Sequence, residues 1–365
     1  MRKRETTQID QLKILLQLTR LGIGHDYNKL VGVPDWKTIE ALAEKQGLTA
    51  IILDGINQLP PEQRPPKDKL LNWIGIVMQD YEYRYTDYEK AIVELANFYS
   101  KNGIKMMVLK GYGLGRNYPV PNHRPCGDID IWNFGRQKEA DALIKEKYKT
   151  HIDKRELHHT RFDWKGYLVE NHYDFLSVQT IKTNALLEPI LKNLAMDDSK
   201  SIKVDGVDIY IPSPNLNALF LLRHMLMHFV AIGIAIRHLL DWGFFWEKYG
   251  QEVDCEWLQG VMSKYTMDTF FNTINAICVE ELGFNSCIFP SAQFNPYIKD
   301  CVLKDILCPE YDWTEVHRLN FLSRLVFKYK RWQAGSWKRK LCYKEGDWIT
   351  FWSSIRAHLL QPVDI

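Results

Sequence analysis

The chain has 365 residues, of which 46% are hydrophobic and 25% are charged, and its net charge is +2; this composition is typical of a globular protein with two or three domains. The near-neutral charge argues against binding nucleic acid through the charge of the whole chain, and no uncharged apolar run reaches the roughly 18 residues that would predict a transmembrane helix. No apolar signal core follows the basic start, and the seven cysteines form no Cys-x-x-Cys pair, so we expect a cytoplasmic protein with reduced thiols.

The first hundred residues predict helices. Apolar residues recur at helical spacing from Ile9 to Leu21, and Pro34-Asp35-Trp36 opens a second helix. A Pro-rich loop precedes a long helix, or a pair of helices, that begins near Lys69 and carries an aromatic stripe typical of core packing. Lys101-Asn102-Gly103 has the pattern of a helix end, so residues 1–100 are expected to form an N-terminal helical region.

Short strands and turns follow, which predicts that residues 101–212 contain a small sheet. A buried strand over 104–109 leads to a short helix from Gly111 and a Pro-rich loop. The elements expected after that loop are a strand through Ile129, a charged helix over 136–147, strands over 156–163 and 167–176 joined at Lys165-Gly166, and a hairpin over 201–211 with its turn at Asp205-Gly206.

Gly127-Asp128-Ile129-Asp130-Ile131 contains two carboxylates in an apolar run. Side chains alternate along a strand, so Asp128 and Asp130 are expected on one face while Ile129 and Ile131 enter the core. Two like charges this close repel each other, and a divalent cation commonly neutralises such a pair. The alternative is a solvated turn or strand edge, because Asp-x-Asp is frequent by chance.

A third carboxylate follows in a second strand. Glu170, His172 and Asp174 would share one face of the strand that begins near Leu168. If that strand lies beside the Asp128/Asp130 strand, Glu170 completes a three-carboxylate site.

The motifs around these carboxylates resemble those of the nucleotidyltransferase superfamily, in particular its branch of uncharacterised bacterial nucleotidyltransferase-like proteins. The matching segments are Val108-Leu109-Lys110-Gly111, Tyr118-Pro119, Arg124-Pro125, Gly127-Asp128-Ile129-Asp130-Ile131 and Val169-Glu170-Asn171-His172, followed far downstream by His228, Arg237 and Asp241. The resemblance covers most of the chain. It implies an α+β fold of the DNA polymerase beta-like type, with a small mixed twisted sheet flanked by N-terminal and C-terminal helical regions.

The resemblance also implies an enzyme that moves a nucleoside monophosphate from an NTP, such as ATP, to an acceptor hydroxyl and releases pyrophosphate. Asp128, Asp130 and Glu170 would hold two Mg²⁺ ions, and Glu170 could also accept the proton of the acceptor. The residues expected to bind the nucleotide and its phosphates are Lys110, Gly111, Tyr112, Arg124 and Gly127. The residues expected near the cleft are His172, His228, Arg237 and Asp241.

The proposed function has an alternative, and so do the roles of Lys110 and Arg124. The superfamily usually has Ser or Gly after the Gly that Gly111 matches, whereas this chain has Tyr112, so the phosphate-binding hydroxyl is missing and Lys110 would supply positive charge instead. A non-catalytic nucleotide-binding or interaction protein with the same fold is therefore the first alternative. For single residues, Lys110 could be a solvated lysine at a strand end, and Arg124 could pair with one of the aspartates.

Residues 213–365 are expected to form a C-terminal helical domain. Its first helix, Leu216 to Val230, places His224 and His228 one turn apart, but no Glu-x-x-His context favours zinc. The resemblance suggests that His228, Arg237 and Asp241 link this domain to the cleft. The alternative is a buried polar network that ties the helices together.

The end of this domain is basic. Between Arg318 and Lys344 there are nine Lys or Arg and no Asp or Glu, with Trp332 and Trp337 interleaved. Such a segment could bind nucleic acid, an acidic partner or an anionic membrane, which would suit an RNA-directed transferase or a toxin–antitoxin partner. We favour a solvated basic helix face with half-buried tryptophans, because the whole chain is nearly neutral.

Overall fold

The computed structural model describes residues 2–25, 30–179, 181–197, 199–290, 293–311 and 321–343. Its N-terminal part is helical, as expected, and Asp35 caps the second helix by accepting a hydrogen bond from the Lys37 amide. The backbones of the first and third helices touch, because a Cβ atom at Gly22 would lie only 1.9 Å from the carbonyl oxygen of Ile51. These elements are α1 (Arg2–Gly22), α2 (Trp36–Gln46), α3 (Thr49–Gln58), η1 (Pro61–Gln63) and α4 (Lys67–Val77).

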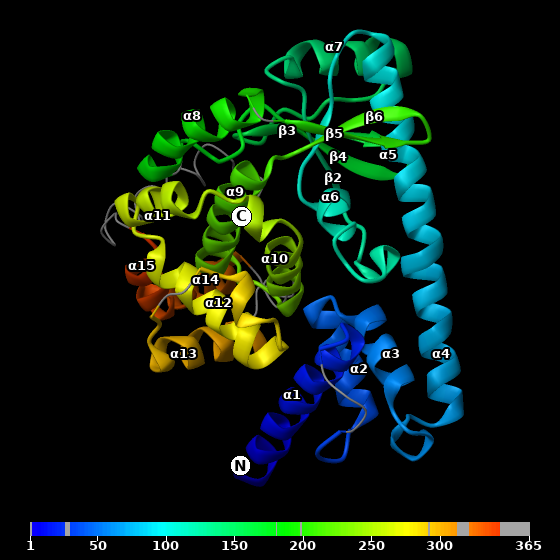
Figure 1. Ribbon diagram of the computed structural model, residues 1–365, viewed down its shortest axis with the longest axis vertical. Coiled ribbons are helices and arrows are strands. Elements are labelled where there is room, and N and C mark those ends of the chain that lie inside the picture. Colours follow the sequence, from blue (N-terminus) through cyan, green and yellow to red (C-terminus); the bar gives the residue numbers. More distant parts are fainter. Residues whose placement is uncertain are drawn as a thin grey trace.

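One long helical rod joins the N-terminal helices to the sheet (Figure 1). In this rod α4 continues through the π-helical segment η2 (Met78–Tyr83) into α5 (Arg84–Lys101). The buried face of α5, which includes Tyr88, Ile92 and Leu95, belongs to the same hydrophobic cluster as the central strands. By its packing α5 therefore lies with the sheet, although the boundary expected at residue 100 assigns nearly all of it to the N-terminal helical region.

The sheet has six strands in the order β3-β4-β2-β1-β6-β5 and is mixed. The pairs β1/β6 and β2/β4 are parallel, and the other three pairs are antiparallel. Both expected hairpins are present, and β1 is shorter than the strand expected over 104–109. The strands are β1 (Met107–Val108), β2 (Ile129–Trp132), β3 (His159–Trp164), β4 (Tyr167–His172), β5 (Lys200–Val204) and β6 (Val207–Ile211).

The two faces of the sheet differ in character. Helices α5 and α7 (Gln137–Tyr148) cover one face, where Ile129, Ile131 and Val169 are buried. The intervening residues of β2 and β4, which include Asp130 and Glu170, belong to the opposite face. The C-terminal helices lie on that side of the sheet (Figure 1). The short helix α6 (Gly111–Gly115) lies against the turn η3 (Pro121–His123), and α6 contacts the C-terminal helix Ile236–Tyr249. The expected α+β fold with a small mixed sheet between helical regions is thus confirmed.

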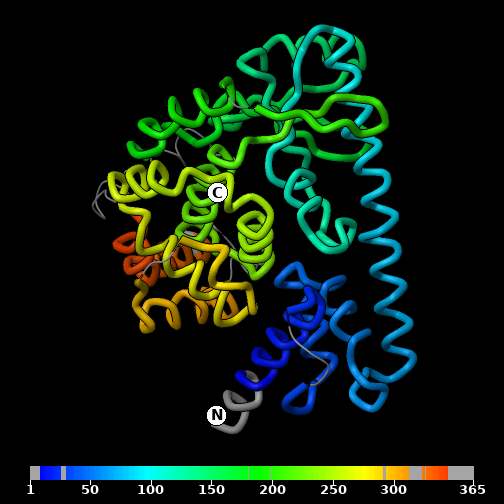
Figure 2. Tube along the Cα trace, in the orientation of Figure 1, coloured from blue at the N-terminus to red at the C-terminus, as the bar shows by residue number. Residues whose placement is uncertain are grey.

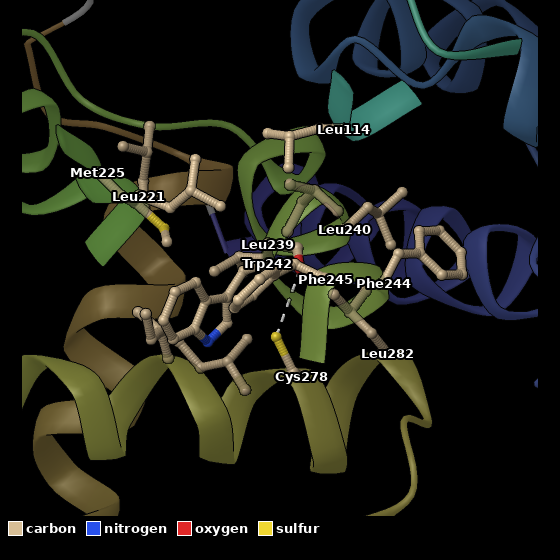
Figure 3. Close-up of a cluster of buried hydrophobic side chains, with 14 of the residues drawn as sticks. Leu114, Leu221, Met225, Leu239, Leu240, Trp242, Phe244, Phe245, Cys278 and Leu282 are labelled. Carbon is tan, nitrogen blue, oxygen red and sulfur yellow. Dashed lines mark hydrogen bonds between the residues drawn. The ribbon is translucent and has the colours of Figure 1, made fainter. Parts of the chain in front are cut away.

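The C-terminal helices pack around α10 (Ile236–Tyr249), and the buried side chains there are drawn in Figure 3. The side chains of Leu239, Trp242 and Phe245 are buried, and the Cys278 thiol of α12 (Asp268–Leu282) donates to the Leu239 carbonyl at 3.5 Å. This packing holds α9 and α10 opposite the sheet. The helices after the first strands are α8 (Lys182–Asp197), which the sequence pattern did not predict, and α9 (Pro214–Ala231), α10 (Ile236–Tyr249), η4 (Gly250–Glu252), α11 (Cys255–Lys264), α12 (Asp268–Leu282), η5 (Ser286–Ile288), α13 (Pro296–Leu307), α14 (Phe321–Ala334) and α15 (Ser336–Cys342).

The chain trace also brings the two helical regions together, because α1 lies against α12 (Figure 2). The Arg20 guanidinium on α1 donates to the Glu281 carbonyl on α12 at 3.3 Å. None of the described helices combines the length and the apolar character needed to cross a membrane.

The basic segment at the end of the chain is partly buried. Lys338 pairs with Asp305 at 2.5 Å, and the Arg339 guanidinium lies 4.2 Å from the centre of the Trp332 ring. Both basic side chains are less than a tenth exposed, so the expectation of a solvated basic face is wrong for them; the segment folds back onto the other C-terminal helices. Residues 318–320 and Lys344, which belong to the same expectation, lie outside the described residues.

Candidate active site

The register of two parallel strands brings the predicted carboxylates together. Asp130 on β2 stands directly beside Glu170 on β4, so the condition for a joint site is met. Asp174 is not part of it, because β4 ends at His172 and Asp174 instead pairs with Lys192 on α8 at 2.5 Å. Asp130 and Glu170 are 40 residues apart in sequence, but the parallel pairing of their strands puts both side chains on the same face of the sheet.

Asp130 is buried and carries two positively polarised neighbours. The Lys110 ammonium donates to Asp130 Oδ1 at 2.8 Å, and His172 Nε2 lies 2.9 Å from the same oxygen. Burial alone would raise the pKa of Asp130, but Lys110 and His172 outweigh it and hold this pKa below the usual range. Burial likewise works to lower the pKa of Lys110, and the carboxylates around it raise that pKa overall. Asp130 is therefore ionised at neutral pH.

Lys110 reaches Asp130 from a strained backbone position. It follows β1 and precedes α6, with φ 46° and ψ −129°, a conformation that favours glycine. Its side chain is 16% exposed and ion-paired, so the alternative of a solvated strand-end lysine is wrong. Helix α6 has only five residues, and its partial positive end is correspondingly weak.

Glu170 is surrounded by cationic and imidazole groups of β3. Arg161 Nε donates to Glu170 Oε1 at 3.0 Å, and His159 Nε2 lies 3.3 Å from that oxygen. Burial works to raise the pKa of Glu170, whereas the His159 contact and the other positive groups lower it overall. Arg161 also pairs with Glu156 at 2.8 Å.

Sequence reasoning missed His158, His159, Arg161 and Glu156 as site residues. The hairpin register supplies the signal that would have found two of them, because a tight turn at Lys165-Gly166 sets Arg161 opposite Glu170 and His159 opposite His172.

Asp128 differs from its partner Asp130. It precedes β2, its side chain is exposed toward the cavity described below, and no other described residue hydrogen-bonds to or ion-pairs with its carboxylate. Partial desolvation and the charge of Asp130 raise the pKa of Asp128. Ligand atoms of Asp130, Glu170 and His172 lie within 4.8 Å of one another, and Asp128 is outside this group.

A cavity of about 400 Å³ lies between this face of the sheet and helices α9 and α10. Its lining contains His228, Arg237 and Asp241, three of the residues that the family resemblance places near the cleft. The residues that line it from the sheet side include Lys110, Gly111, Arg124, Gly127, Asp128, Asp130, His158, His159, Arg161 and Glu170. Those from the helices include His224, His228, Arg237, His238, Asp241 and Trp242. His172 lies beneath this lining, against Asp130.

Arg124 is fully engaged by a carboxylate of the C-terminal domain. Its Nε and Nη2 donate to the two oxygens of Asp241 at 2.8 and 3.0 Å, and Tyr118 Oη donates to Asp241 Oδ1 at 2.8 Å. The alternative of an ion pair thus holds for Arg124, although its partner is Asp241 rather than Asp128 or Asp130. This placement argues against Arg124 as the phosphate-binding residue.

Arg237 lines the same cavity without such a partner. Among the residues that the structure describes, none forms a hydrogen bond or ion pair with its guanidinium. Burial, together with the charge of Arg124, lowers the pKa of Arg237. A guanidinium stays protonated in proteins, so Arg237 presents a positive charge to the cavity.

The helix side of the cavity also carries three imidazoles. The rings of His224 and His228 are 4.3 Å apart, and His238 follows on α10. Burial lowers the pKa of His228 to about 4 and that of His238 to about 3, and it also lowers the pKa of His224. These imidazoles are neutral at pH 7. Within the described part of the chain, no third metal ligand joins His224 and His228, so zinc is not favoured there.

Tyr112 points away from the cavity, contrary to its expected role in nucleotide binding. Its hydroxyl donates to Glu89 Oε2 at 2.6 Å, and its ring stacks on Tyr85 of α5. The turn into α6 directs successive side chains to different sides, so Gly111 faces the cavity and Tyr112 enters the α5 interface.

Comparisons with known proteins identify the family of this chain. The sequence model of a family described as uncharacterised nucleotidyltransferase matches residues 33–283. None of the curated proteins matches the chain. A solved structure of an antigenic nucleotidyltransferase-like protein from Paracoccidioides brasiliensis is 14% identical over 55% of this chain and 95% of that chain, with a TM-score of 0.34. Since the family match spans well over half of the sequence and contains the carboxylate strands, the chain belongs to the uncharacterised nucleotidyltransferase family.

Proposed function

We propose that this protein is a nucleotidyltransferase that moves a nucleoside monophosphate from an NTP to an acceptor hydroxyl and releases pyrophosphate. The observation that carries the proposal is the placement of Asp130 beside Glu170 at one wall of the cavity, with Asp128 nearby. Ionised carboxylates on adjacent strands in a cavity of this size are what a metal–nucleotide complex requires.

The donor set fits a divalent cation. Oxygens of Asp130 and Glu170 and a nitrogen of His172 lie within 4.8 Å of one another, and Asp128 adds a carboxylate without a protein partner. Asp128, Asp130 and Glu170 would hold the Mg²⁺ ions of the proposed reaction. Bound ions would neutralise triphosphate charge and activate the attacking hydroxyl. The lowered pKa of Glu170 keeps it ionised at neutral pH, which suits a metal ligand better than a proton acceptor.

The rest of the cavity would position the substrates. Arg237 offers a guanidinium to the triphosphate, in place of the engaged Arg124. Leu221, Met225 and Trp242 give the opposite wall an apolar part against which a base or an acceptor can pack. Helices α9 and α10 would exclude water from the reacting groups.

The main alternative is a non-catalytic nucleotide-binding or interaction protein with the same fold. The contacts of Asp130 agree with this alternative, because Lys110 and His172 already neutralise the carboxylate without a metal ion. The basic tail gives little support to an RNA-directed role, since Lys338 and Arg339 are buried.

Calorimetry of NTP binding with and without Mg²⁺ tests the proposal. We expect Mg²⁺-dependent binding by the wild type and its loss in the Asp128→Asn/Asp130→Asn variant. Asp174→Asn is the matched control, because Asp174 lies outside the cavity lining and pairs with Lys192. NTP turnover by the double variant would contradict the mechanism, and the absence of NTP binding by the wild type would favour the non-catalytic alternative.

Two arginines of the cavity allow a second test. Arg237→Gln should weaken NTP binding by about tenfold or more, the usual effect of losing a hydrogen bond to a charged group, and leave folding stability nearly unchanged. Arg124→Gln should instead lower the free energy of unfolding by about 3–5 kcal/mol, because it leaves Asp241 buried without its partner. Calorimetry and urea unfolding measure the two effects. Unchanged NTP affinity in Arg237→Gln would remove Arg237 from the nucleotide site.

A further inference from the structure

His172 is held in a way that points one nitrogen at the carboxylates. The residue is 2% exposed, and its Nδ1 lies 3.2 Å from the carbonyl oxygen of Asp174. Because a carbonyl only accepts hydrogen bonds, Nδ1 carries the hydrogen and donates to it. Nε2 then faces Asp130 Oδ1 at 2.9 Å and Glu170 Oε2 at 3.9 Å. So short a contact between Nε2 and a carboxylate needs a positive species between the two atoms: either a second ring hydrogen, which Nε2 donates to Asp130 in the metal-free protein, or a metal ion that takes its place.

This arrangement is the one that metal-bound histidines show. Such histidines donate their second ring N–H to a carbonyl or carboxylate, which fixes the ring and directs the lone pair of the other nitrogen at the metal. In this protein the acceptor of that hydrogen bond is the Asp174 carbonyl, just beyond the end of β4.

A second group of possible ligands shares His172 but is less suitable. His158, His159 and His172 also lie close together. However, His159 Nδ1 and His158 Nε2 are within hydrogen-bonding distance of each other, at 3.1 Å, and Arg161 Nε donates to His159 Nε2 at 3.1 Å. A metal ion at the three histidines would have to break these bonds. At Asp130, Glu170 and His172 it would replace the contacts of Lys110 and His172 with Asp130 and those of Arg161 and His159 with Glu170. The two carboxylates there supply negative charge that the three histidines lack.

We propose that His172 is a metal ligand together with Asp130 and Glu170, and that this mixed site prefers a first-row transition dication, such as Mn²⁺, over Mg²⁺. Mg²⁺ favours an all-oxygen octahedral shell, whereas an imidazole nitrogen adds affinity for transition metals. The inference rests on the proposed function for the carboxylates and extends it by naming the nitrogen ligand and the preferred class of ion.

Mn²⁺ binding in the absence of nucleotide tests this inference. Electron paramagnetic resonance counts free Mn²⁺ during a titration, and pulsed measurements detect ¹⁴N coupling from a bound imidazole. We expect the wild type to bind Mn²⁺ with ¹⁴N coupling and to release it only at a large excess of Mg²⁺. His172→Gln should lose the coupling and bind Mn²⁺ about tenfold or more weakly, with a smaller loss of Mg²⁺ affinity. His159→Gln is the matched control, a buried neighbouring histidine that should keep the coupling.

Several results would overturn the inference. Wild-type protein without ¹⁴N coupling, or without any Mn²⁺ binding, would do so even if His172→Gln failed to fold. Coupling that survives in His172→Gln and disappears in His159→Gln would move the ion to the other histidines. The result also distinguishes this inference from the proposed function. Mn²⁺ binding with ¹⁴N coupling but without NTP binding would support the metal site and contradict the transferase function. Mg²⁺-dependent NTP binding without ¹⁴N coupling would support the transferase function and contradict His172 as a metal ligand.

Discussion

At the scale of single residues, Lys110 combines a buried charge with a strained backbone. Lys110→Gly and Lys110→Ala both remove the ammonium from Asp130, but only glycine adopts φ 46° and ψ −129° without a steric penalty. We therefore expect the glycine variant to be more stable than the alanine variant by about 1–3 kcal/mol, measured by urea unfolding. Equal stabilities would show that the backbone at this residue is not strained.

The pair Lys110 and Tyr112 also shows what local sequence cannot specify. Their motif predicted a short helix from Gly111 after a buried strand, and both elements are present. It did not predict that Lys110 would reach Asp130 while Tyr112 packs on α5, because both contacts depend on elements 20 or more residues away.

At the scale of elements, α8 secures the end of β4 through a buried carboxylate. Glu188 accepts hydrogen bonds from the amides of Phe175 and Leu176 at 2.8 and 3.0 Å. Burial raises the pKa of Glu188 to about 7. The folded state therefore holds this proton more tightly than the unfolded state, and the stability contributed by the group falls as pH rises from about 4.5 to about 7.

Glu188→Gln isolates this effect, because glutamine does not titrate. The free energy of unfolding of the wild type, relative to that of the variant, should fall by roughly 3 kcal/mol between pH 4.5 and pH 7.5. Urea unfolding at several pH values measures the difference, and the comparison cancels the titration of all other groups. A difference that stays constant with pH would mean that Glu188 is ionised in the folded protein with an ordinary pKa.

At the scale of the whole molecule, His123 joins three parts of the chain. Its Nδ1 lies 2.7 Å from Asp54 Oδ2 on α3, and its Nε2 lies 3.2 Å from Glu82 Oε1 on η2. Residue 124, next in the chain, pairs with Asp241 on α10. The loop between α6 and β2 therefore contacts both helical regions that flank the sheet.

The charge of His123 makes this junction sensitive to pH. Burial works to lower the pKa of His123, but Asp54 and Glu82 outweigh it and raise the pKa overall. The resulting stabilisation is fully present below pH 6.5 and is lost as pH rises through the higher folded-state pKa. His123→Gln should thus cost about 1.5–3 kcal/mol at pH 5.5 and clearly less at pH 9, measured by urea unfolding. An equal cost at both pH values would contradict the charged contact.

The sequence by itself determined the local parts of this protein. Residue spacing predicted the N-terminal helices, the turns at Lys165-Gly166 and Asp205-Gly206, and the strand whose parity puts Asp130 and Ile131 on opposite faces. These features depend on residues that are close in sequence, and their physical cause is the period of the helix or strand and the chemistry of the turn.

Only the tertiary structure decided which of these parts meet. The alternation of side chains along β4 determines which face of the sheet Glu170 occupies. The parallel pairing of β2 with β4 makes Glu170 the neighbour of Asp130. The same holds for the pairing of Arg124 with Asp241, which lie 117 residues apart, and for the burial of Arg339 in the basic segment. Such contacts arise when apolar faces pack and bring distant charges into one desolvated space, and no local pattern encodes which charges those will be.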